Sequence, residues 1–174
     1  RPLADELAEL RKIAQRAKEI DQRDAGGDIL DAHCKLLEAR LTKNQEARQP
    51  VLEQAIASFE AANKKIAEEA AANEVYRFPV LLGIADASVQ LANSIDTKNT
   101  ERIGKYLGEA ETAAKAAAQL KQERSRVLLV WGNALEDQAW LLKNTDQYIA
   151  AIEKFLEAQK AAQDNQQEEV ESKA

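Results

Sequence analysis

The chain has 174 residues and a formal charge of −6, with 45% hydrophobic and 31% charged residues, a composition typical of one folded domain. The net negative charge repels phosphate backbones, and since no run of Lys and Arg opposes it, nucleic-acid binding is disfavoured. The longest apolar runs, such as 127–131, are too short to cross a bilayer, so we expect no membrane insertion. Aromatic residues make up only 5%, so alanine and leucine must form a thin, extended core.

Apolar residues recur at helical spacing along most of the chain, and no segment has the pattern of a strand. The first helix is predicted over 3–23, and it should end at Ala25-Gly26-Gly27 because glycine accepts the left-handed geometry of a helix C-terminus. Asp28 is the expected N-cap of a second helix, which should extend to about Lys43. Residues 44–49 are predicted to form a turn.

Prolines mark the expected starts of the third and fourth helices, since an N–H in the first turn has no helical partner anyway. The third helix is predicted over 50–73 and the fourth over 79–95, beginning at Pro50 and Pro79. A polar turn at 96–99 then leads to a fifth helix, for which Thr100 is the expected N-cap.

The clearest pair of helices lies near the C-terminus. Residues 127–142 and 148–162 each carry an apolar stripe, and 143–146 is a short polar link between them. A short link makes two helices antiparallel neighbours, so this segment is predicted to be a helical hairpin. The polar stretch 121–126 before it predicts a turn in which Ser125 is a candidate cap, and the acidic residues 164–174 predict a disordered tail.

The hairpin has looser copies upstream. Ala-x-x-x-Phe-x-x-Ala occurs at 55–62 and again at 151–158, and a weaker copy at 103–110 lies halfway between them. A Lys-Asn pair also stands in each of three predicted turns, at 43–44, 98–99 and 143–144. These repeats predict a single all-α domain of about seven helices over 1–163. It would consist of a capping helix over 1–24 and hairpins over 28–73, 79–122 and 125–162.

These motifs resemble the tetratricopeptide repeat family, whose second helix carries a small residue, an aromatic residue four later and an alanine three after that. Residues 151–158 match this pattern closely, Trp131-Gly132 matches the large residue and glycine of the family's first helix, and Leu82-Gly83 matches more weakly. The resemblance implies an antiparallel helix-hairpin solenoid. Because the helices are longer than a standard repeat of about 34 residues allows, the chain would be a divergent, long-helix variant. The alternative is a plain helical bundle whose alanine and leucine pattern mimics a repeat.

Side chains typical of catalysis or metal binding are nearly absent. His33 is the only histidine and Cys34 the only cysteine. Adjacent helical residues do not face each other, so they make a poor catalytic pair, and no second ligand stands at metal-binding spacing. Cys34 lies on an apolar stripe and is expected to be buried. We therefore expect no enzymatic activity, no metal and no cofactor.

In the resembled family, the first helix of each repeat lines a concave groove that holds a peptide or a partner helix, and solenoids offer such surfaces by geometry alone. Leu129 replaces the lysine with which some members bind chaperone C-termini, so that activity is not expected. The positions that this comparison predicts to contact a partner are Asn133, Asp137 and Trp140 in the third hairpin, Asp86, Gln90 and Asn93 in the second, and Lys35, with Arg40 and His33, in the first.

The leading hypothesis is a non-enzymatic adaptor that binds a protein or peptide partner in this groove. A soluble small-ligand-binding or transport-accessory protein is the alternative, and an enclosed apolar cavity would favour it. A homodimer is a third hypothesis, which a large apolar patch on an end helix would favour. The chain begins Arg1-Pro2 without a recognisable signal peptide. This start indicates an excised domain or a processed mature chain and leaves the compartment open.

Overall fold

The protein is described by a computed structural model that covers every residue except 1–2, 22–23, 69–73, 121–123 and 172–174, and of 3–4, 74–75 and 165–171 it describes the backbone only. The described residues form helices and no strand, which confirms the predicted all-α class. None of these helices is both long and apolar enough to cross a membrane. The helices are α1 (Leu3–Ile20), α2 (Gly26–Leu41), α3 (Gln45–Glu68), α4 (Glu74–Ala92), α5 (Thr100–Gln119), α6 (Arg124–Leu142) and α7 (Thr145–Glu171).

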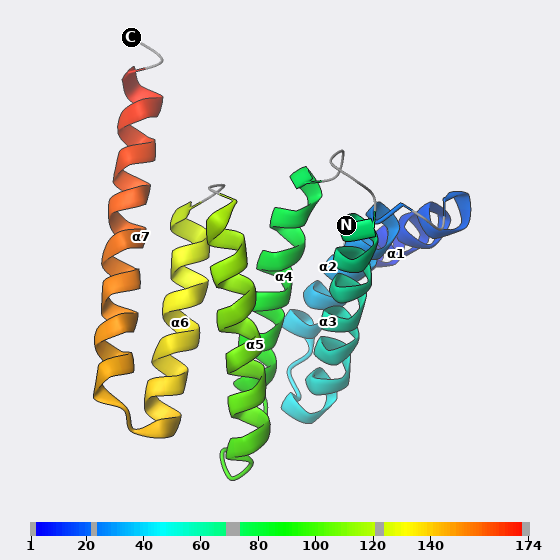
Figure 1. The fold of residues 1–174 in the computed structure, drawn as a ribbon. Helices are drawn as coiled ribbons and strands as arrows, with labels where there is room; N and C mark the ends of the chain where they lie inside the picture. The colour runs from blue at the N-terminus through cyan, green and yellow to red at the C-terminus, as the bar shows by residue number, and fades with distance from the viewer. Residues whose placement is uncertain (1–2, 22–23, 69–73, 121–123, 172–174) are drawn as a thin grey trace.

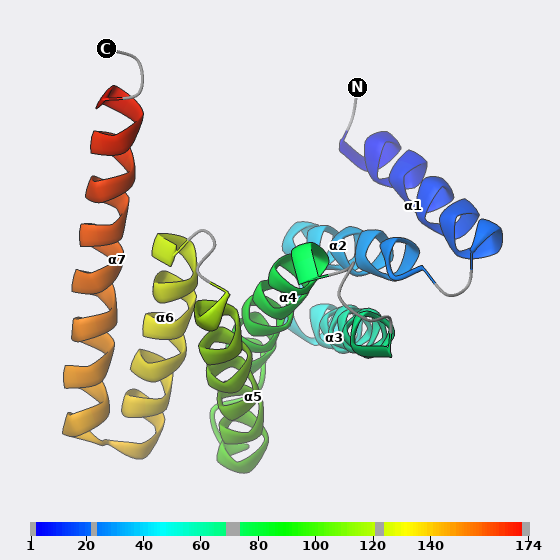
Figure 2. The same ribbon diagram turned by 45° about the horizontal axis from the view of Figure 1, so that its top comes forward.

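The helices stand in a single row, in which each one packs against its neighbours in the sequence (Figure 1). Close backbone approaches beyond these neighbours join α2 to α4 and α4 to α6, whereas no such backbone approach joins the described parts of α1, α3, α5 and α7. The even-numbered helices therefore lie closer to one another than the odd-numbered helices do. We call the surface along α2, α4 and α6 the inner face and the opposite surface the outer face. Figure 2 shows α1 at one end of the row and α7 at the other.

The helices α3 and α4 begin at Gln45 and Glu74 rather than at Pro50 and Pro79, so both prolines lie inside a helix. The predicted turn at 44–49 is therefore wrong beyond Asn44. The side-chain Oδ1 of Asn44 accepts a hydrogen bond from the N–H of Ala47 at 3.1 Å, and this contact caps α3 at Gln45 rather than at Pro50. Each proline is the sixth residue of its helix, past the first turn, so it removes one hydrogen bond that the helix would otherwise make.

Asp28 is not a helix cap. The helix α2 already begins at Gly26, and Asp28 lies in its first turn with 8% of its surface exposed, paired with Lys18 and Lys65. Gly26 and Gly27 were predicted to supply the left-handed geometry of a helix end, but neither has a positive φ. A Cβ added to Gly27 would lie 2.9 Å from the backbone nitrogen of Lys18, so this glycine permits the close approach of α1 and α2.

The remaining turns also differ in detail from the prediction. Asn99 rather than Thr100 caps α5, since its Oδ1 accepts a hydrogen bond from the N–H of Arg102 at 3.3 Å. The helix α6 begins at Arg124, before the candidate cap Ser125. The helix α7 continues to Glu171, past the start of the predicted disordered tail at 164. The predicted end of the third helix at 73 lies outside the described residues, and so do residues 121–123 of the turn predicted over 121–126. Residues 124–126 are helical, so this part of the predicted turn is wrong.

The three Lys-Asn pairs do not form one common turn. Lys143 has a φ of 51° and is the only described residue other than glycine with a positive φ. The N–H of Asn144 donates to the carbonyl of Ala139 at 3.0 Å, which closes the end of α6 with a left-handed residue. The pairs at 43–44 and 98–99 lack this geometry, so the sequence likeness does not extend to backbone conformation.

The aromatic residues of the repeated motif pack against glycines. Phe59 is fully buried, and a Cβ added to Gly83 of α4 would lie 2.4 Å from its Cζ. A Cβ added to Gly132 of α6 would likewise lie 2.5 Å from Cε1 of Phe155. However, Phe59 reaches from α3 forward to α4, whereas Phe155 reaches from α7 back to α6. The two contacts therefore occupy different places in the row. Cys34 is buried, as its position on the apolar stripe predicts.

Candidate functional site

Five of the predicted contact residues form two hydrogen-bonded groups on the inner face. Asp86 of α4 accepts hydrogen bonds from Arg40 of α2 at 2.6 Å and from Gln90 at 3.0 Å. Two turns further on, directly after the end of α4, the amide of Asn93 donates to the carboxylate of Asp137 of α6 at 3.1 Å. These side chains form a polar line that crosses from α2 over α4 to α6, because α4 contacts both α2 and α6.

Three further predicted contact residues, Asn133, Trp140 and Lys35, lie in different surroundings. Asn133 stands one turn before Asp137 on α6 and is exposed. Trp140, at the end of α6, is 61% exposed and lines a shallow hollow of about 450 Å³ with Tyr148 at the turns beyond the polar line. The ammonium group of Lys35 points towards α3, so Lys35 does not belong to the inner face.

A hollow of about 320 Å³ opens on the inner face between α2, α4 and the start of α6. Its floor is apolar and its rim is polar. Sequence analysis missed Arg126 and the floor residues, because their meeting depends on how α6 packs across α4. The lining consists of Leu36, Leu37, Phe78, Pro79, Leu82 and Gly83, with His33, Arg40, Asp86 and Arg126 as its polar members.

The surroundings of His33 favour the neutral form of its imidazole. Partial burial lowers the pKa of His33, the positive charges of Arg126 and Arg40 lower it further, and the negative charge of Asp86 opposes them. The ring also meets Phe59 edge to face, with the ring centroids 5.0 Å apart. A neutral imidazole at this rim can donate one hydrogen bond and accept another.

Asp137 is a partly buried carboxylate without a cationic partner among the described residues. Burial raises its pKa, the negative charge of Glu136 raises it as well, and the hydrogen bond from Asn93 opposes both. A single amide is a weak partner for a carboxylate in such a position. Asp137 is therefore suited to accept a cation from outside the chain.

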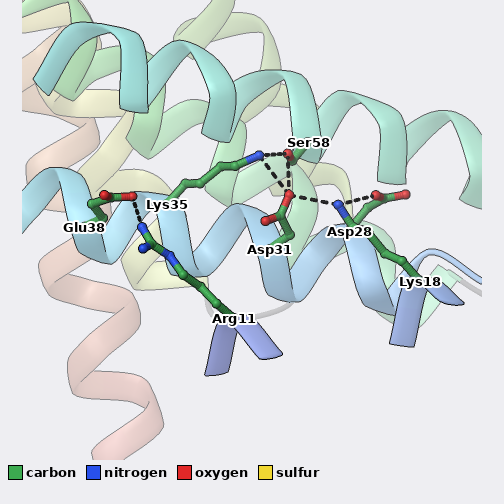
Figure 3. A network of polar contacts seen from close by, with 7 residues as sticks. All are labelled: Arg11, Lys18, Asp28, Asp31, Lys35, Glu38 and Ser58. Atoms are coloured by element: carbon green, nitrogen blue, oxygen red, sulfur yellow. Dashed lines mark hydrogen bonds and ion pairs between the residues drawn. The ribbon is translucent and has the colours of Figure 1, made fainter. Parts of the chain in front are cut away.

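A second group of charges joins α1, α2 and α3 (Figure 3). Lys18 of α1 reaches both Asp28 and Asp31 of α2, at 3.1 and 2.9 Å. Lys35 contacts Asp31 at 2.8 Å and donates to Ser58 of α3 at 2.9 Å. Every charge in this group has an opposite charge beside it, which indicates a structural role rather than a binding site.

The same group shifts the acidity of its two carboxylates. Burial alone would raise the pKa values of Asp28 and Asp31, but the hydrogen bonds and charges of the neighbouring lysines outweigh it and bring both below their ordinary values. A further ion pair between Arg11 and Glu38 joins α1 to α2 (Figure 3). The attachment of α1 thus depends strongly on charge.

Within the part of the chain that the structure describes, no three side chains of His, Cys, Asp or Glu are grouped in a way that could hold a metal ion. The sequence matches no protein-family model, and comparison with curated proteins and with solved structures finds no match.

Proposed function

We propose that the chain is a non-enzymatic helical-repeat protein of tetratricopeptide-like architecture that binds an extended peptide segment of another protein along its inner face. The observation that supports this most directly is the polar line from Arg40–Asp86 to Asn93–Asp137, which joins three helices on one surface. Amide side chains such as Gln90 and Asn93 suit a peptide backbone, because an amide can donate to a carbonyl and accept from an N–H.

The shape of the inner face supports a peptide over an enclosed small molecule. The hollow beside the polar line is open to the surface, and its volume of about 320 Å³ is at the lower end for small-molecule pockets. A hollow with an apolar floor and a charged rim can accept one side chain of a peptide. The rest of the peptide would then lie along the exposed polar groups of α4 and α6.

Selection from a random linear peptide library, followed by affinity measurement on purified protein, tests this function. The inner-face variant carries Asn133→Ala and Asp137→Arg, and the control variant Glu60→Arg makes the same charge change on the outer face. Selected peptides should bind the control as tightly as the wild type and the inner-face variant at least about tenfold more weakly. Equal binding to both variants, with helix content unchanged by circular dichroism, would place the peptide elsewhere and refute the proposal.

Self-association is a second candidate function, and a feature of α7 favours it. Ile149, Ile152 and Leu156 are 52%, 56% and 60% exposed, and their spacing places them on one side of the end helix. Two copies could cover these apolar stripes by pairing their α7 helices. Sedimentation velocity over a range of concentrations tests this, since Ile152→Glu should abolish a dimer, and a wild-type chain that stays monomeric at high concentration would exclude it.

A further inference from the structure

A hollow of about 810 Å³ lies beside α6 and is lined by residues of α5, α6 and α7; we call it the α5–α7 hollow. Residues 124, 128 and 131 line it from one side of α6, because their spacing follows the helical repeat. Asn133 and Asp137 lie on a different side of the same helix, so this hollow is separate from the polar line on the inner face. Its volume is within the range of about 300–1,000 Å³ that is usual for small-molecule sites.

The floor of the α5–α7 hollow is apolar and includes Trp131, Leu128 and Ala161. The ammonium groups of Lys154 and Lys115 lie 4.6 and 5.7 Å from the centroid of the Trp131 ring, so side chains of α7 and α5 both hold the indole in place. The indole N–H is buried and has no acceptor among the described residues. A buried donor without a partner is costly, so a ligand with an acceptor that this N–H can reach by a small turn of the ring is favoured.

The charged side chains of the hollow leave a positive excess. Arg124 of α6 and Lys160 of α7 both line it, and neither makes an ion pair or a side-chain hydrogen bond within the described part of the chain. Of the two carboxylates in the lining, Glu157 is paired with Lys154 at 2.6 Å, which leaves Asp164. Two cations without a partner thus stand against one such anion, although the whole chain has a formal charge of −6.

We propose that the α5–α7 hollow binds a small organic anion that has one negative charge and an apolar body, such as an aromatic or aliphatic carboxylate. The guanidinium of Arg124 can donate two hydrogen bonds to a carboxylate, and the ammonium of Lys160 adds a second positive charge. The apolar body would cover the floor at Trp131. A neutral ligand would leave both cations unmatched, whereas a ligand with several negative charges would be repelled by Asp164.

Two dyes with the same aromatic body test the proposal by fluorescence titration of the full chain. Anilinonaphthalene sulfonate carries one negative charge, and phenylnaphthylamine is the same molecule without the sulfonate. The site variant carries Arg124→Gln and Lys160→Gln. The control variant carries Lys64→Gln and Lys105→Gln, which remove the same two charges from side chains that are 79% and 65% exposed and lie outside the hollow. Circular dichroism checks that the helix content of both variants is unchanged.

The sulfonate dye should bind the wild type and the control variant equally and the site variant at least about tenfold more weakly, because hydrogen bonds to a charged group are lost. Phenylnaphthylamine should bind the wild type at least about tenfold more weakly than the sulfonate dye does, with the same affinity for all three chains. Equal binding of the sulfonate dye to the site and control variants would overturn the proposal, and so would equal affinity of the two dyes for the wild type.

Nuclear magnetic resonance locates the bound dye. The chain has two tryptophans, so a nitrogen–proton correlation spectrum of the isotope-labelled chain contains two indole signals, which the variant Trp140→Phe assigns. The sulfonate dye should move the signal of Trp131, leave that of Trp140 in place, and move the Trp131 signal less in the site variant. Movement of the Trp140 signal without that of Trp131 would place the dye elsewhere and overturn the proposal.

Discussion

Two glycines inside helices provide a matched test of the packing between α3 and α4. A Cβ added to Gly83 would lie 2.4 Å from Cζ and 2.6 Å from Cε1 of Phe59, whereas one added to Gly108 of α5 meets no atom within 4 Å. Neither glycine has a positive φ, so alanine is compatible with both backbones. Because alanine favours a helix over glycine by about 1 kcal/mol, Gly108→Ala should raise the free energy of unfolding by about that amount.

Gly83→Ala adds a steric cost to the same gain in propensity. Phe59 is 0% exposed, and His33 stands edge-on against its ring, so the ring cannot move aside without disturbing the core. Overpacking of this kind costs about 1–3 kcal/mol. The free energies of unfolding of Gly83→Ala and Gly108→Ala should therefore differ by about 1–3 kcal/mol, with Gly83→Ala the less stable variant.

Urea unfolding followed by circular dichroism measures this difference. A double variant with Gly83→Ala and Phe59→Leu provides the control, because the smaller leucine removes the clash. Its loss of stability should be smaller than the sum of the two single losses. If Gly83→Ala stabilises the chain as much as Gly108→Ala does, α3 and α4 do not approach each other through this contact.

Three further predictions concern single side chains. Lys143→Gly should raise the melting temperature by relieving about 1 kcal/mol of left-handed strain, whereas Lys98→Gly, at a residue without a positive φ, should not. Urea titration should show a loss of about 3–5 kcal/mol for Phe59→Ala and a smaller one for the half-buried Phe155→Ala. The pKa of Asp31 is lower in the folded chain, so its contribution to stability is complete above its unfolded pKa of about 4 and is lost as the pH falls through the folded value. Asp31→Asn should therefore be less stable than the wild type at pH 7, and unfolding measured at decreasing pH should show the difference disappear.

The helices themselves could be predicted because their signal is local. The burial of Phe59 and Leu107 follows from apolar spacing within one helix, which needs no knowledge of the partner. Helix starts were harder to predict, because proline only permits a start in its vicinity. The cap that Asn44 provides determines the start of α3, and Pro50 is tolerated inside the resulting helix.

Partners distant in the sequence account for the errors at charged residues. Asp28 has the residue type of a cap, but Lys18 and Lys65 hold it from two other helices. Lys35 was predicted to face a partner, but its contacts with Asp31 and Ser58 turn it towards α3. The sequence contains the residues of each ion pair without indicating which of them will meet.

The candidate site was predictable within one helix and not between helices. Asp86, Gln90 and Asn93 share a side of α4 because their spacing follows the helical repeat. The contact of Asn93 with Asp137 depends on the packing of α4 against α6, which apolar periodicity does not specify. Arg126 was placed in a turn, so its position at the hollow was missed.

The contrast between the two faces explains why binding is expected on the inner one. On the inner face the short side chains of Asn93 and Asp137 meet directly, because α4 and α6 are in contact. On the outer face the backbones of α3 and α5 do not approach each other closely, and longer side chains join the two helices, with Arg102 reaching Glu53 at 2.6 Å. Long side chains lose more rotamer freedom when a ligand fixes them, whereas short ones already held between packed helices lose little. Polar groups on the inner face are thus the better preorganised set for recognising a peptide.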